Sequence, residues 1–143
     1  MRRLGFYFLL LGFYSCLQIE VTDHNQFPNN TDTLIAQYGE PLMREKGEEQ
    51  SEFLHYPQGL SFEIKDQSVL AKHVVPQAME TSLAYWKDKF NPYESNFREL
   101  SGDVRRDGIP FQQLIRCDRL GIHIIYDPGL QKVTKIIYVN KSI

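Results

Sequence analysis

Two stretches of this chain resemble one another at a spacing of about 63 residues, and this repetition limits the folds that the chain can adopt. Phe27 aligns with Phe90, and the run 59–64 (GLSFEI) aligns with the run 121–126 (GIHIIY). Similar offsets align Gly39, Glu40 and Pro41 with Gly108, Ile109 and Pro110, and Leu70, Lys72 and Val74 with Val133, Lys135 and Ile137. We therefore expect two copies of one structural unit in tandem.

The residue pattern of each half predicts a helix followed by three antiparallel strands. The run 32–38 has apolar residues along one side, and Gly39 follows at a position that tolerates a positive φ angle. The run 60–65 alternates between apolar and polar residues, as in an antiparallel sheet with one covered and one wet face. The two sets are Leu60, Phe62 and Ile64, and Ser61, Glu63 and Lys65. The expected fold class is α+β, with helices packed on an antiparallel β-sheet as a tandem α-β-β-β repeat.

Two further helices are predicted around the middle of the chain. The run 76–90 places Met79, Leu83, Trp86 and Phe90 on one face, and we expect Trp86 to pack in the core. A second helix is expected to begin at Asn91-Pro92, with Glu94 completing a capping box. Its apolar face would contain Tyr93, Phe97, Leu100 and Val104.

Residues 1–16 (MRRLGFYFLLLGFYSC) have the order of an export signal. The apolar run 4–14 is shorter than the ~20 residues of a spanning helix. Its end, Ser15-Cys16, resembles the cleavage site of bacterial lipoproteins, which implies acylation of Cys16 and attachment to the membrane through lipid. Because no aspartate follows Cys16, we expect the outer membrane, facing the periplasm. The alternative is a plain secretory signal cut near Ser15, which would give a secreted protein.

The expected organisation has four parts: a lipoprotein signal peptide at 1–15, a polar tether at 16–30, a first α-β-β-β unit at 31–75, and a connecting helix with the second unit at 76–143. A net charge of −2 without a basic stripe gives nucleic-acid binding no support. If Cys16 is acylated, Cys117 has no intramolecular partner, and we expect it to be a buried apolar residue.

The leader, the tether and the order of helix, Gly-x-Pro and three strands together resemble the BamE (SmpA/OmlA) lipoprotein family, and more widely the fold of the β-lactamase inhibitor protein. The matching residues are Leu34, Gly39, Pro41, Phe53, Leu54, Tyr56, Leu60, Phe62 and Ile64, then Gly108, Pro110, Leu114, Ile122, Ile124 and Tyr126. The resemblance implies a protein that binds envelope proteins, including outer-membrane assembly machinery, without a cofactor or a catalytic group. The second copy and the 76–90 insert depart from the single-copy assembly factor.

The wet face of the strands is the expected partner-binding surface. We expect its contact residues to be Ser61, Glu63, His123 and Ile125, of which Ile125 is an apolar side chain in the polar register. The function expected is a non-catalytic binding or scaffold module. The alternative is a secreted or periplasmic inhibitor or immunity-type protein that binds an enzyme through Tyr93 or the charged loop 44–49.

No catalytic motif, and no spacing typical of a metal site, occurs in the sequence. His55, His73 and His123 fall on predicted strands, where two of them could meet and bind zinc, but a solvent-facing or hydrogen-bonded histidine is the simpler interpretation. An enzyme would need these histidines to converge with carboxylates in a cleft. We therefore expect no metal, no cofactor and no enzymatic activity.

Overall fold

The computed structural model describes residues 27–90, 97–102, 108 and 111–142. In chain order it contains α1 (Thr31–Tyr38), β1 (Met43–Lys46), β2 (Glu52–Tyr56), the 3-10 turn η2 (Pro57–Gly59), β3 (Leu60–Lys65), β4 (Ser68–Val74), the 3-10 turn η3 (Ala78–Glu80), α2 (Leu83–Phe90), β5 (Arg98–Ser101), β6 (Gln113–Cys117), β7 (Ile122–Asp127) and β8 (Lys132–Val139). The predicted signal peptide, Cys16, most of the predicted tether and Tyr93 lie outside the described residues.

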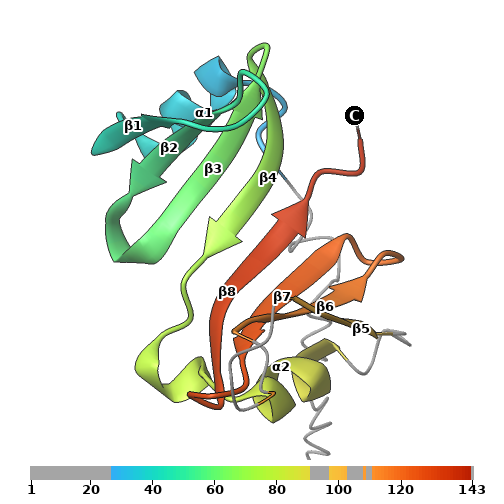
Figure 1. Cartoon of the computed structure of the whole chain (residues 1–143). Coiled ribbons are helices and arrows are strands. Elements are labelled where there is room, and N and C mark those ends of the chain that lie inside the picture. The colour runs from blue at the N-terminus through green and yellow to red at the C-terminus, as the bar shows by residue number, and fades with distance from the viewer. Residues whose placement is uncertain (1–26, 91–96, 103–107, 109–110, 143) are drawn as a thin grey trace, which may run out of the picture.

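All of these strands form one antiparallel sheet in the order β1-β2-β3-β4-β8-β7-β6-β5. Figure 1 shows α1 beside β1–β4, α2 beside β5–β8, and β4 next to β8 in the middle. The α+β class with helices on an antiparallel sheet is confirmed. Each half has four strands rather than the expected three, because the short edge strands β1 and β5 extend the sheet at either end.

Local signals explain where the first elements begin and end. The Asn30 side chain accepts a hydrogen bond from the Thr33 amide and caps α1. Gly39 follows α1 with φ of 82°, in a region that glycine adopts without steric cost, and its amide bonds the Ile35 carbonyl. At the β3–β4 turn, Asp66 and Gln67 both have positive φ, as the tight hairpin requires.

Two apolar clusters hold the helices against one face of the sheet. In the first half, Leu34 of α1 packs with Leu54, Tyr56, Phe62, Ile64 and Val69. In the second half, Trp86 and Phe90 of α2 pack with Ile115, Cys117, Leu120, Ile122, Ile124, Val133, Ile136 and Tyr138. Phe27 contacts both clusters. The predictions that Trp86 packs in the core and that Cys117 is buried are confirmed, since the two are 2% and 0% exposed.

The predicted helix that starts at Asn91 is wrong where the structure describes the chain, because Arg98–Ser101 is strand β5. The spacing of Phe97 and Leu100 is compatible with a helix, but the cross-strand partners of β5 lie far away in sequence. Its Glu99 carboxylate binds Lys87 of α2 and Gln113 of β6. Pairing with β6 adds β5 to the edge of the sheet, which the helical pattern did not indicate.

The predicted helix 76–90 is also shorter than expected. It is divided into η3 and α2. At the start of α2, the hydroxyl of Ser82 accepts a hydrogen bond from the Tyr85 amide. Met79, which precedes this break, is 94% exposed rather than in the core. The apolar residues recur at helical spacing without a gap, so the prediction included one helical turn that is not part of α2.

The alignment expected between the last strands of the two halves, which matched Leu70 with Val133 and Lys72 with Lys135, does not agree with the observed burial. Lys72 faces the core side, where its ammonium lies 5.8 Å from the centroid of the Tyr138 ring, whereas Lys135 is exposed. Val133 is buried, but Leu70 is only half-buried. A register irregularity at Glu63/Ile64 shifts β4 against β3, which changes the face that each residue of β4 occupies.

Candidate functional site

The candidate site is the face of the sheet opposite the two described helices. We call the side that packs on α1 and α2 the helix face, and the opposite side the open face. In β3, Phe62 belongs to the helix face and its neighbours Ser61 and Glu63 to the open face. In β7, Ile124 belongs to the helix face and His123 to the open face. The candidate side chains lie on the open face because they alternate with the core residues along each strand.

One row of side chains crosses the open face from edge to edge. Each member is the cross-strand neighbour of the next in the observed register. In sheet order the row contains Met43, His55, Ser61, His73, Ile137, His123, Arg116 and Arg98. The row joins the two halves at β4 and β8, where His73 is opposite Ile137.

All four residues predicted to bind a partner lie on this face, two in each half. Ser61 and Glu63 are on β3, and His123 and Ile125 are on β7, with β4 and β8 between the pairs. All four are half-buried rather than fully solvated. The alternation therefore placed them on one face, but it could not show that the central strands separate them.

His73 is the open-face residue whose environment differs most from expectation. Its side chain is 10% exposed, and neither ring nitrogen has a hydrogen-bond partner among the described residues. Burial, followed by the nearby positive charge of Lys135 and by His55, lowers its pKa to about 4, so the ring is neutral at pH 7. The expectation of a solvent-facing or hydrogen-bonded histidine is wrong here, because β8 and the Phe53 ring, whose centroid is 5.3 Å away, cover it.

A second row on the same face contains Glu45, Phe53 and Glu63 on β1, β2 and β3. With Gly47, Glu48 and Ser51 of the β1–β2 turn, this row lines a hollow of about 470 Å³. Lys46 also lines this hollow. The Glu45 carboxylate is 2.9 Å from His55 Nε2, and the Glu63 carboxylate is 3.6 Å from His73 Nε2. The loop predicted at 44–49 is thus half strand, and two of its acidic residues, Glu45 and Glu48, line this hollow.

The second half of the open face carries cationic and apolar side chains. Arg116 and Arg98 both bind the Asp118 carboxylate, and these arginines hold its pKa below the usual value. Burial, with Arg116 nearby, lowers the pKa of His123. The next row toward the β7–β8 hairpin contains Lys135, Ile125, Leu114 and Leu100, of which Leu100 is 44% exposed.

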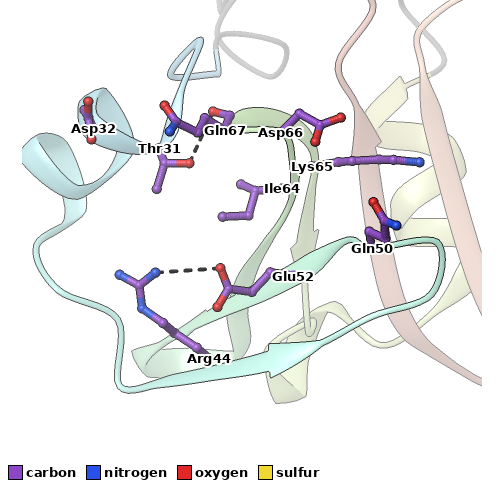
Figure 2. Close-up of a pocket in the computed structure, with 9 residues that line it drawn as sticks. All are labelled: Thr31, Asp32, Arg44, Gln50, Glu52, Ile64, Lys65, Asp66 and Gln67. Atoms are coloured by element: carbon purple, nitrogen blue, oxygen red, sulfur yellow. Dashed lines mark hydrogen bonds and ion pairs between the residues drawn. The ribbon is translucent and has the colours of Figure 1, made fainter.

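A different hollow of about 310 Å³ lies between the start of α1 and the β1–β2 hairpin. Figure 2 shows Ile64 directed into it, the Arg44 guanidinium paired with the Glu52 carboxylate, and the Thr31 hydroxyl bonded to the Gln67 carbonyl. The Arg44 and Glu52 groups are 3.7 Å apart. The rest of the lining is Asp32, Gln50, Lys65 and Asp66, so only part of the polar groups in this hollow pair with one another.

The three strand histidines do not converge. His55, His73 and His123 occupy alternate strands of the row rather than neighbouring ones. In the part of the chain that the structure describes, no three His, Cys, Asp or Glu side chains are placed to hold a metal ion. Neither described helix is long and apolar enough to cross a bilayer.

Comparison with known proteins gives one distant likeness. No protein-family model matches the chain, and no curated protein matches it. A solved structure of an extracellular protein containing an SCP domain from Bacillus anthracis is similar at 12% identity, with a TM-score of 0.49. The match covers 82% of this chain and 45% of that one, so this chain spans less than half the length of its structural neighbour. A likeness at this level identifies neither a family nor a function.

Proposed function

We propose that this protein is a non-catalytic binding module of the bacterial envelope, anchored through lipid at Cys16, and that its open face receives a partner protein. The observation that carries the proposal is the edge-to-edge row on the open face, which neither described helix covers. The BamE-like resemblance supports a partner among envelope proteins, with outer-membrane assembly as the context.

The make-up of the open face suits protein recognition. It combines half-buried apolar residues such as Ile125 and Ile137 with arginines and histidines that can form directed hydrogen bonds. Its half-buried side chains lose little conformational freedom when a partner covers them, because neighbouring strands already restrict them. An extended, nearly continuous sheet surface also offers more contact area than a loop.

A specific observation favours the inhibitor-like alternative in part. The β1–β2 hairpin is an exposed edge, with all of Met43–Lys46 solvent-accessible, and it carries acidic residues at its turn. A hairpin of this kind could enter the cleft of an enzyme. The two functions differ in their effect on the partner: an inhibitor abolishes the activity of its partner at equimolar concentration, whereas a scaffold leaves that activity intact.

We also propose that the two halves are copies of one unit. Two observations support it: each half has the order helix and four antiparallel strands, and Gly59 and Gly121 both have positive φ directly before the third strand. A circular permutant that places 76–142 before 27–75 should fold, because β4 and β8 would still meet at the centre. Failure of that permutant to fold, alongside a folded parent chain, would contradict equivalence.

The binding proposal is tested by photo-crosslinking in the cells that make the protein. A photoreactive phenylalanine at Ser61 or His123 should give the same discrete adduct, identified by mass spectrometry. The same group at Ala36 of α1 or Ala84 of α2, both exposed on the helix side, should not give that adduct. Equal adducts from both faces, or none from the open face, would reject the open face as the binding surface.

A further inference from the structure

The lining of the hollow beside the β1–β2 hairpin contains more carboxylates than cationic groups. Its walls carry the carboxylates of Glu45, Glu48 and Glu63, against one ammonium, that of Lys46. The Glu48 carboxylate has no ion pair with any described residue. Glu63 is the critical member, because its side chain is only 28% exposed and therefore poorly solvated.

A buried polar group next to Glu63 lacks its own partner. The His73 ring is nine-tenths buried, touches the Phe53 ring, and directs Nε2 toward the Glu63 carboxylate at 3.6 Å, which is beyond hydrogen-bond distance. Because His73 is neutral at pH 7, it does not supply the positive charge that Glu63 lacks. The Glu63 carboxylate therefore keeps its capacity to accept hydrogen bonds from a cationic ligand.

The walls of the hollow restrict the kind of cation. The Phe53 ring forms an apolar, π-electron surface in the same row as two of the carboxylates. A guanidinium is planar, stacks on aromatic rings and pairs with carboxylates through two parallel hydrogen bonds. The volume of about 470 Å³ is of the size that accepts a side chain. Gly47 keeps the hollow open, since a Cβ there would lie 2.9 Å from the Phe53 ring.

We infer that this hollow binds an arginine side chain of the partner protein, held by Glu63 and Glu45 and stacked on Phe53. The inference rests on the proposed binding function and names the chemistry of one contact. His55, bonded to Glu45, acts as a positioning residue that restricts that carboxylate, and the His73 ring lies beside Glu63.

The test uses the ¹⁵N-labelled whole chain and a blocked pentapeptide, acetyl-Gly-Ser-Arg-Gly-Ser-amide. We expect saturable amide shifts at Gly47, Phe53 and Glu63, which a citrulline peptide of the same shape without the charge does not produce. Glu63→Gln should weaken the peptide about fivefold, which is the scale of one partly screened ion pair. The matched control is Glu52→Gln, because Glu52 lies on β2 next to Phe53 but faces the other hollow.

Each outcome decides the inference. Equal shifts from the citrulline peptide, shifts centred on Glu52, or equal weakening by both substitutions would overturn it. If Glu63→Gln does not fold, two measurements on the wild type still decide the inference. They are the loss of binding of the arginine peptide at high salt and the absence of shifts with the citrulline peptide. A partner cross-linked at Ser61 while the arginine peptide gives no shifts would leave the binding function standing and reject the arginine contact.

Discussion

His73 gives the protein a predictable loss of stability in mild acid. In the unfolded chain its pKa is about 6.5, whereas burial lowers the folded value to about 4. As the pH falls below 6.5, the unfolded state takes up a proton that the folded state refuses, so the free energy of unfolding decreases. The contribution is fully present above pH 6.5 and fully lost below about pH 4.

The size of this effect follows from the two pKa values. Each pH unit between them is worth about 1.4 kcal/mol, so the complete loss is about 3 kcal/mol. Between pH 7 and pH 5 the same linkage gives a loss of about 2 kcal/mol. The ionisable groups around the ring are Glu63 on β3, Lys135 on β8 and His55 on β2; burial and then Lys135 are the largest causes of the lowered pKa of His73.

The measurement is urea unfolding at pH 7, 6 and 5, followed by the fluorescence of the buried Trp86. His73→Leu should remove about 2 kcal/mol of the difference between pH 7 and pH 5, because it keeps the ring's volume without the titration. Lys135→Met should reduce the difference in part, and Lys132→Met, three residues away on the same strand, should not. If wild type and His73→Leu lose equal stability over this range, the burial argument is wrong.

The other predictions concern the core, the backbone and the anchor. Phe62→Ala and Ile124→Ala should each lower the free energy of unfolding by about 3 kcal/mol, and a cost near zero at both would show that the strand faces are misassigned. Gly121→Ala should cost about 1–3 kcal/mol more than Gly108→Ala in the same denaturation assay, because both have positive φ but only at Gly121 would a Cβ meet a backbone oxygen, at 2.9 Å; equal costs would refute this. Cys16→Ser should abolish palmitate labelling and release the chain from membranes, and unchanged retention would reject acylation there.

Sequence reasoning succeeded where the signal is local. The end of α1 at Gly39, the alternation of β3 and the burial of Trp86 all depend on residues within one or two turns of the chain. The same reasoning failed at β5, whose Glu99 is held by Lys87 and Gln113 from other elements. A short edge strand obtains its stability from such distant partners, and periodicity within its own residues does not reveal them.

Part of the candidate site could be predicted from the sequence, because the face on which a strand residue lies also depends on a local pattern. Alternation assigned Ser61, Glu63, His123 and Ile125 to one face, which the structure bears out. It could not place His73, because the burial of that ring depends on β8 pairing with β4, a contact between residues 64 positions apart, 73 and 137. Nor could it show the acidic hollow, which needs β1, β2 and β3 side by side.

The seam between β4 and β8 carries two basic side chains where apolar ones would be more stable. Lys72 and His73 are neighbours on opposite faces of β4, and burial lowers the pKa of both. A buried ionisable group usually costs stability relative to a well-packed apolar residue. On the helix face, the Tyr138 ring partly offsets this cost by lying against the Lys72 ammonium. On the open face, neither ring nitrogen of His73 has a hydrogen-bond partner among the described residues, so the Phe53 ring packed against it offsets the cost of burial only through apolar contact.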